Sequence, residues 1–168
     1  MGNKQKREKT GVDLRQGQRA IATNRRARHD YHILEQHEAG LILNGTEVKS
    51  LRKGRCSLAD SYASFKDGEL YLHKMHIPPY EQGNRFNVDS KRSRKLLLHA
   101  SELRRLIGAV TQKGLTLVPL RVYFSGQYAK VLIALCRGKH SYDKREAIRR
   151  RDEDRELARE RKALRDIR

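Results

Sequence analysis

Histidines are the residues of this sequence best suited to acid–base or metal chemistry, and there are seven of them. Two pairs are spaced three residues apart, His29 with His32 and His73 with His76. Both pairs are expected on strands, where residues i and i+3 point to opposite faces. A metal ion needs its ligands on one side, so this spacing does not predict a shared metal site.

Other signatures of catalysis are missing from the sequence. It contains no HExxH, no pair of CxxC motifs, no Walker loop and no GxSxG. His37 and Glu38 could form an acid–base pair, but adjacent strand residues also point apart. Cys56 and Cys136 lie eighty positions apart and are interpreted as small buried thiols. We therefore expect no enzymatic activity, no metal and no cofactor.

Basic residues gather in three short stretches whose side chains suit RNA. Arginine neutralises phosphates and stacks on bases, histidine and tyrosine add stacking faces, and asparagine can read a base edge. The candidate RNA-binding residues are Asn24, Arg25, Arg26, Arg28, His29 and Tyr31 in the first stretch, Lys49, Arg52, Lys53 and Arg55 in the second, and Lys91, Arg92, Arg94 and Lys95 in the third. Each stretch alone could be a solvated charged run, but together they predict a continuous positive surface.

The second and third stretches each have an expected local structure. In KSLRKGR (49–55), a helix would place Lys49, Arg52 and Lys53 on one face and let Val48 and Leu51 turn toward the barrel. DSKRSRKLLLH (89–99) is expected to form a basic loop anchored by its three leucines.

Short antiparallel strands are the main elements that must position these stretches. SYASFKDGELYLHKMHI (61–77) predicts a hairpin around Asp67-Gly68. LTLVPLRVYF (115–124) and YAKVLIALC (128–136) predict a second hairpin. In its first strand, simple alternation would put these residues on one side: Val118, Leu120, Val122 and Phe124. HDYHILEQHEAGLIL (29–43) predicts one or two more strands, bent near Gly40.

Two helices are expected between the strands. The first covers 45–54, with Thr46 as N-cap and Gly54 as the stop. The second covers 100–114, with Ser101 as cap and Gly114 at its end. Its apolar residues recur at i, i+3, i+4 and i+7, at Leu103, Leu106, Ile107 and Val110.

These elements predict a mainly β fold, an OB-like antiparallel barrel of about six strands with two to three flanking helices. The expected organisation is a basic, mostly disordered arm over 1–22, an RNA-binding barrel over 23–137 and a charged tail over 138–168. From residue 137 onward there are thirteen Lys/Arg and eight Asp/Glu, a net of +5. Apolar residues are too sparse there for a good stripe, so we expect a marginal helix that forms on a partner.

The net charge of +18 and pI of about 10.4 imply an anionic partner, which could be a nucleic acid, an acidic protein or a membrane surface. A membrane is the least favoured, because the sequence has no long apolar run. The first thirty residues also lack the hydrophobic stretch of a signal peptide, so a cytoplasmic location is expected.

Several of these motifs, taken in order, resemble the small protein B family, the SsrA-binding proteins of bacterial trans-translation. The motifs are NRRARHDY, EAGLILNGTEVKSLRKG, ADSY, DGELYL, RSRKLLLH, ELRRLIG and GKHSYDKR, and they span roughly residues 20–150. The resemblance implies an OB-like barrel that acts as a monomer and binds the tRNA-like domain of transfer-messenger RNA. It also implies delivery to stalled ribosomes in a complex that contains elongation factor Tu, with the tail becoming helical in the empty messenger channel lined by small-subunit rRNA.

The same resemblance assigns particular positions. It implies that Asn24, Arg25 and Glu38 face RNA, together with the basic positions of KSLRKG and RSRKLLL. The tail motif that would contact the ribosome comprises Gly138, Lys139, His140, Tyr142, Asp143, Lys144 and Arg145.

Three other functions remain open from composition. A general single-strand RNA-binding or ribosomal protein fits the charge equally well, and its binding groove should show exposed aromatics on a sheet face. An RNA-processing enzyme is disfavoured by the motif search. A basic chaperone or adaptor for acidic proteins would keep its complexes after RNase treatment.

Overall fold

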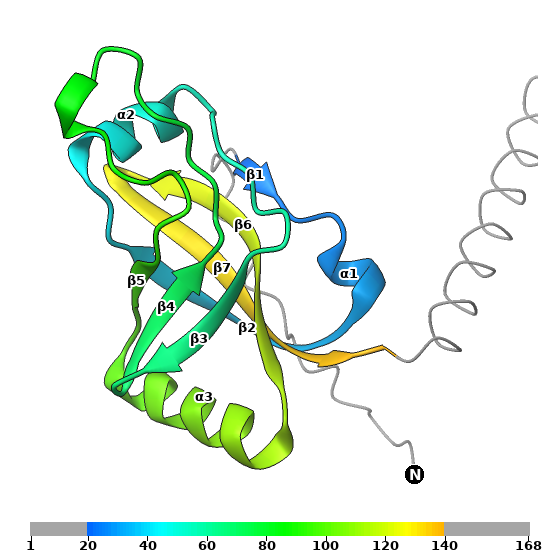
Figure 1. Ribbon diagram of the computed structural model, residues 1–168. Helices are drawn as coiled ribbons and strands as arrows, with labels where there is room; N and C mark the ends of the chain where they lie inside the picture. The colour runs from blue at the N-terminus through cyan, green and yellow to red at the C-terminus, as the bar shows by residue number, and fades with distance from the viewer. Residues whose placement is uncertain (1–19, 140–168) are drawn as a thin grey trace, which may run out of the picture.

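The computed structural model describes residues 20–139 (Figure 1). Most of the expected N-terminal arm and of the tail therefore lies outside the described residues. Along the chain, the elements are β1 (Ala20–Thr23), α1 (Ala27–Asp30), β2 (Tyr31–Leu41), α2 (Gly45–Arg52), β3 (Tyr62–Lys66), β4 (Glu69–His73), the 3-10 turn η1 (Asn84–Phe86), β5 (Arg94–Leu97), α3 (Ala100–Lys113), β6 (Thr116–Ser125) and β7 (Tyr128–Gly138).

The strands form one antiparallel sheet in the order β1-β6-β3-β4-β5-β2-β7, and β6 also pairs with β7. That second pairing closes six strands into a barrel, and β1 adds to the outer part of β6. The predicted mainly β antiparallel barrel with flanking helices is confirmed. Helix α3 lies across one end of the barrel, while α2 and the β4–β5 connection lie at the other (Figure 1).

Two tight turns set the register of the predicted hairpins. Asp67 and Gly68 both have positive φ, +52° and +76°, as a two-residue turn between β3 and β4 requires. In the second hairpin Ser125 pairs with Tyr128, and Gly126 has a φ of +61°. Because each turn fixes a partner for every residue that follows, the two hairpins align as expected.

A β-bulge in β6 overturns the expectation that Val118, Leu120, Val122 and Phe124 share one side. The register shifts between Pro119 and Arg121, so the residue between them has no partner of its own. Val118 and Leu120 therefore pack in an outer cluster beneath α1, whereas Val122 faces the barrel interior. The bulge lets one strand serve two cores.

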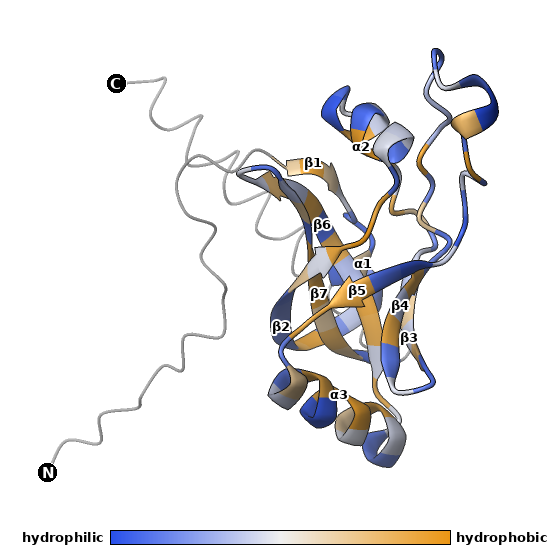
Figure 2. Ribbon diagram, turned by 90° about the vertical axis from the view of Figure 1, so that its left-hand side faces the viewer, coloured by the Kyte–Doolittle hydropathy of each residue, from blue (hydrophilic) through white to orange (hydrophobic). Residues whose placement is uncertain are grey.

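Apolar side chains fill the barrel interior, and Figure 2 shows orange stretches along the barrel strands. Leu70, Leu72 and Ile133 are fully buried there. In α3, Leu106 is buried and Leu103 and Val110 pack partly against this core. The period of the helix predicted these three contacts, but Ile107, the fourth predicted residue, is half-buried and is not among the residues that pack on this core.

The helix boundaries refine the expected caps. The N-cap of α2 is Asn44 rather than Thr46, and the Asn44 backbone N–H donates to Glu47 Oε2 at 2.8 Å, which is half of a capping box. Helix α3 follows His99, so Ser101 lies inside its first turn. Gly114 ends α3 in the left-handed conformation, as predicted.

The described strands extend slightly beyond 23–137, the bounds expected for the barrel. Strand β1 already begins at Ala20 and β7 continues to Gly138. Beyond β7, Lys139 N–H donates to the Asp30 carbonyl at 3.0 Å. Among residues 20–139, no helix is long and apolar enough to cross a membrane.

Candidate nucleic-acid interface

The first basic stretch forms the corner between β1 and α1. Asn24 shapes this corner: its amide Nδ2 donates to the Pro119 carbonyl at 3.2 Å, and its Oδ1 accepts from the Ala27 N–H at 3.2 Å. The side chains of Arg25, Arg26 and Arg28 are exposed around it. Asn24 thus holds a turn whose neighbours present positive charge to solvent.

The beginning of the tail motif lies against this corner. Gly138 pairs with Tyr31 in the β2–β7 ladder, and the Lys139 ammonium donates to the Arg28 carbonyl at 3.1 Å. His29 Nδ1 lies 2.9 Å from Asp30 Oδ1. The predicted tail residues His140, Tyr142, Asp143, Lys144 and Arg145 lie outside the described residues. The point where the tail leaves the barrel is nevertheless beside the first basic stretch.

The second basic stretch lies on α2, with its cations exposed as the helical spacing predicted. Leu51 is fully buried beneath them. The Lys49 and Lys53 ammonium groups lie 5.3 and 4.7 Å from the centre of the Tyr80 ring. The Arg52 guanidinium lies 5.8 Å from the Phe124 ring centre, and Arg55 pairs with Glu81 at 2.5 Å. Aromatic rings therefore hold these cations at the surface.

The third stretch is not the basic loop that was expected. Residues 94–97 form β5, and Arg94 is completely buried. Its guanidinium donates to Glu47 Oε1 at 2.9 Å and to the Met75 and Ser90 carbonyls at 2.5 and 3.0 Å. The prediction of Arg94 as an RNA-binding residue is wrong, because the side chain is buried and its guanidinium is hydrogen-bonded within the protein.

The other members of this stretch differ in how far they reach solvent. Arg92 donates to Glu47 Oε2 at 2.5 Å and keeps 27% of its side chain exposed. Lys95 pairs with Glu69 at the surface, and Lys91 is exposed. The hydrogen bond with Glu69 raises the pKa of Lys95, so its positive charge is retained. Lys91, Arg92 and Lys95 remain candidates for contact with an anion.

Glu47 is the point at which the second and third stretches meet. Its carboxylate is 4% exposed. Burial alone would raise its pKa, but hydrogen bonds from Arg92 and the Asn44 backbone, with the charge of Arg94, outweigh burial and lower it. Burial also lowers the pKa of Arg94, against the charge of Glu47. The buried charges are thus paired and hydrogen-bonded, as stability requires.

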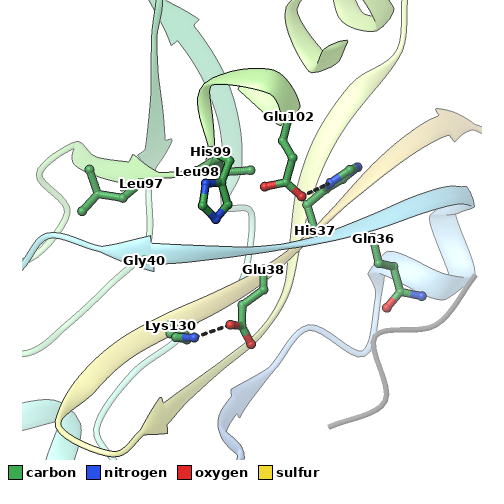
Figure 3. Close-up of a pocket in the computed structure, with 9 residues that line it drawn as sticks. All are labelled: Gln36, His37, Glu38, Gly40, Leu97, Leu98, His99, Glu102 and Lys130. Atoms are coloured by element: carbon green, nitrogen blue, oxygen red, sulfur yellow. Dashed lines mark hydrogen bonds and ion pairs between the residues drawn. The ribbon is translucent and has the colours of Figure 1, made fainter. Parts of the chain in front are cut away.

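Glu38 lies in an open groove of about 520 Å³ between β2, β7 and the start of α3 (Figure 3). Its carboxylate accepts hydrogen bonds from the Tyr123 hydroxyl and the Lys130 ammonium, and both Glu38 and Lys130 have 31% of the side chain exposed. Burial, then the bond to Glu38, raises the pKa of Tyr123. The carboxylate therefore fixes a lysine at the groove. The further groove-lining residues are Gln36, His37, Gly40, Leu97, Leu98, His99 and Glu102.

His37 connects β2 to α3 through two acidic side chains. His37 is 7% exposed, and its two ring nitrogens lie 3.4 Å from Glu102 Oε1 and Glu35 Oε2. The hydrogen bond from Arg105 lowers the pKa of Glu35. This cluster ties β2 to α3. Residues 20–139 contain no group of three or more histidine, cysteine or acidic side chains arranged to hold a metal ion.

Three exposed or half-buried residues that are further candidates for this surface were not predicted from the sequence: Lys130, Arg85 and Phe86. Lys130 is 92 positions from Glu38, and only the β2–β7 register brings them together. Arg85 and Phe86 lie in the β4–β5 connection, where the sequence shows no periodic pattern. An arginine beside an aromatic in EQGNRFN was a signal that could have been followed.

Comparison with known proteins agrees over most of the chain. A family model described as SmpB protein matches residues 21–163. The SsrA-binding protein of Carboxydothermus hydrogenoformans is 58% identical over 148 residues, which cover 88% of this chain and 97% of that relative. The SsrA-binding protein of Enterococcus faecalis is 55% identical over 139 residues, which cover 83% of this chain and 90% of that relative. A chain in a solved structure of tmRNA-SmpB at the center of the bacterial ribosome has 60% identity and a TM-score of 0.61, covering 76% of this chain and 94% of that chain.

Proposed function

The chain belongs to the SmpB protein family, and from this premise we propose that it binds the tRNA-like domain of transfer-messenger RNA and brings it to stalled ribosomes for trans-translation. The observation that carries the proposal is the agreement between the family match, which spans the whole described barrel, and the exposed cations on α1, α2 and the groove of Glu38. The protein acts as a binding factor in the cytoplasm, not as an enzyme.

The proposed RNA-binding surface combines the accessible basic residues with three polar or acidic neighbours, Asn24, Tyr31 and Glu38. It comprises Asn24, Arg25, Arg26, Arg28, His29, Tyr31, Glu38, Lys49, Arg52, Lys53, Arg55, Lys91, Arg92, Lys95 and Lys130. The hollow lined by Ala20, Ile21, Arg52 and Lys53 connects α2 to β1, and β1 leads to the α1 corner. The cations supply phosphate binding, while the groove supplies contacts that depend on RNA shape.

Glu38 has a specific part in this proposal. A carboxylate repels phosphate, so at an RNA surface it serves either to accept hydrogen bonds from base or sugar donors or to orient a cation. Lys130 is the cation that Glu38 orients here. An ammonium carries three N–H groups, so Lys130 can bind a phosphate while it remains paired.

The tail is proposed to enter the empty messenger channel of the ribosome after delivery with elongation factor Tu. Residues 140–168 carry eleven Lys/Arg and eight Asp/Glu, and this net charge of +3 favours an rRNA-lined channel. The interspersed acids would limit non-specific binding. Gly138 and Lys139 belong to the barrel edge, so a deletion that tests the tail should begin at residue 140.

General single-strand binding is less well supported. Such a protein should show a row of exposed aromatics on one sheet face. Among the described residues, the exposed aromatics are Tyr62, Phe86 and Tyr128, and Phe86 lies in a connection while Tyr128 begins β7 beside its turn. Tyr62 is stacked on His73, with ring centres 5.2 Å apart.

The test is a binding titration of the full chain and a 1–139 truncation with transfer-messenger RNA, with bulk tRNA as competitor, across a salt series. We expect both chains to prefer transfer-messenger RNA. In a second assay, which follows peptide tagging on stalled ribosomes, we expect only the full chain to support tagging. Equal competition by tRNA would overturn the proposal in favour of general RNA binding. Tagging by the truncated chain would overturn the role of the tail.

A further inference from the structure

Phe86 is held in solvent at the tip of the β4–β5 connection, with 69% of its surface exposed. A phenylalanine in that position contributes little to folding, since burial is what makes an apolar side chain stabilising. The Arg85 guanidinium lies 5.2 Å from the centre of its ring. The ring therefore has a cation beside it and still leaves most of its surface to solvent.

The connection that carries Phe86 is ordered by its own contacts. Asn87 closes it with two hydrogen bonds to Tyr80: Oδ1 accepts from the backbone N–H and Nδ2 donates to the carbonyl, both at 2.9 Å. Gly83 makes room for this clamp, because a Cβ there would lie 2.6 Å from Asn87 Oδ1. The η1 turn, which ends at Phe86, lies between Tyr80 and Asn87, the two residues that this clamp joins.

Helix α2 anchors the same connection from the side. Thr46 Oγ1 donates to the Phe86 carbonyl at 3.3 Å, and Ser50 Oγ donates to the Pro78 carbonyl at 2.9 Å. Glu47 of α2 binds Arg92 near the end of the connection. The exposed ring thus has a set position relative to α2, so a ligand that binds it does not have to order a loop.

Cations lie over both aromatic rings of the connection, Tyr80 and Phe86. Lys49 of α2 and Lys53, directly after the helix, lie over the Tyr80 ring of this connection, and Arg85 borders Phe86 itself. The connection has two exposed acids: Glu81 is paired with Arg55, and Asp89 Oδ1 accepts a hydrogen bond from the Lys91 backbone N–H at 3.0 Å. An aromatic face flanked by cations is the arrangement that takes a nucleotide, whose base stacks and whose phosphates need counter-charge.

An apolar protein partner suits this place less well. Phenylalanine and arginine are common in the core of a protein–protein interface, but lysine is depleted there, so the two lysines beside this connection are the residues that argue against a protein partner. Phe86 has Asn84, Arg85 and Asn87 as its chain neighbours, and the adjacent helix presents lysines. Charge complementarity therefore favours RNA.

We propose that Phe86, with Arg85, forms a stacking site for one unpaired base of the bound RNA, and that Lys49 and Lys53 bind the phosphates beside that base. The inference rests on the proposed function and extends its site from the basic clusters to the β4–β5 connection. The ring supplies a contact without charge, so its contribution to affinity should be separable from phosphate binding by salt.

The test compares the full chain with Phe86→Leu and Phe86→Tyr in binding transfer-messenger RNA across a salt series. Leucine keeps the apolar bulk but removes the aromatic face, whereas tyrosine keeps the face. We expect Phe86→Leu to weaken binding about 5- to 150-fold, the range for loss of one base–aromatic stack, with no change in salt slope. Phe86→Tyr should bind as the parent does. In contrast, Lys49→Ala should lower the salt slope by about 0.7–0.9.

A cross-link identifies the class of the partner. With p-benzoylphenylalanine in place of Phe86, we expect a cross-link to an unpaired nucleotide in the complex with transfer-messenger RNA. Equal affinity of Phe86→Leu and the parent chain, or cross-links on ribosomes to protein alone, would overturn the stacking site. The parent titration with tRNA competitor decides the proposed function separately, because the Phe86→Leu comparison holds for whichever RNA binds.

Discussion

Arg94 of β5 and Glu47 of α2 form a buried ion pair, with Arg94 Nε donating to Glu47 Oε1 at 2.9 Å and side-chain exposures of 0% and 4%. The pair joins the barrel to the helix that carries the second basic stretch. Arg92 binds the other carboxylate oxygen from the edge of the same site. A basic residue in an RNA-binding region thus serves the fold, and its neighbour two positions away remains partly exposed.

Arg94→Ala should destabilise the protein strongly. The substitution leaves the Glu47 carboxylate buried with only Arg92 as a cation, and breaking a buried pair in this way costs about 3–5 kcal/mol. Arg92 should keep the loss near the lower end. Urea unfolding of the parent and the variant measures this loss of unfolding free energy. The matched control is Arg105→Ala, whose pair with Glu35 is 63% exposed on the arginine side and should cost less than about 1 kcal/mol. Equal losses would contradict the structural role of Arg94.

Glu47 should also contribute to stability in a pH-dependent way. The fold lowers its pKa from the ordinary 4.5, so the stabilisation is complete above about pH 4.5 and is lost as the pH falls through the lowered value. Glu47→Gln keeps a capping side chain but cannot titrate. The free-energy difference between parent and variant should therefore shrink on acidification. Unfolding at a series of pH values tests this, and parallel curves for the two proteins would refute it.

Local sequence signals predicted the parts of the fold that depend on neighbouring residues. Asp67-Gly68 and Gly126 turn where expected because their φ angles suit few other residues. The cap of α2 also depends on neighbouring residues, although Thr46 was predicted in place of Asn44. Asn44 and Glu47 have the spacing of a capping box, and this signal could have identified the cap. Gly114 ends α3 for the same kind of local reason.

Features that depend on distant partners could not be read in this way. Arg94 looks like its basic neighbours until β5 pairs with β4 and brings it beneath α2, 47 positions from its partner. The bulge after Pro119 reverses the faces of β6 through pairing with β7, not through any change in alternation. The groove of Glu38 and Lys130 likewise arises from strand register.

Lys130→Ala should weaken binding to transfer-messenger RNA about tenfold, because a hydrogen bond to a charged group contributes roughly 1.5 kcal/mol or more. The salt slope should fall by about 0.7–0.9 for one lost phosphate contact. The control is Lys113→Ala, an exposed lysine at the end of α3 at the opposite end of the barrel from α2. If Lys113→Ala weakened binding as much as Lys130→Ala, the groove would hold no special contact.

The two cysteines should be inert in the folded protein. Burial raises the pKa of the Cys56 thiol to about 12 and that of Cys136 to about 11, and the thiolate is the reactive form. An aromatic disulfide reagent at about pH 8 should therefore react slowly with the native chain. After unfolding in urea, both thiols should react rapidly. Rapid reaction of one thiol in the native protein would show that its site opens locally.

Gly83→Ala should loosen the connection that presents Phe86. Its Cβ would lie 2.6 Å from Asn87 Oδ1, so the Asn87 amide must swing away and lose both bonds to Tyr80. Two net hydrogen bonds correspond to about 1–2 kcal/mol.

Amide hydrogen exchange measures the effect directly, since the Tyr80 N–H should exchange faster once Asn87 Oδ1 has left it. Gly108→Ala is the matched control, because nothing lies within 4 Å of a Cβ at that helical position and the change should stabilise α3 by about 0.5–1 kcal/mol. If the stacking site depends on a pre-ordered connection, Gly83→Ala should also weaken RNA binding without altering the salt slope. Faster exchange at Tyr80 with unchanged affinity would mean that Phe86 finds its base from a mobile loop as readily as from a fixed one.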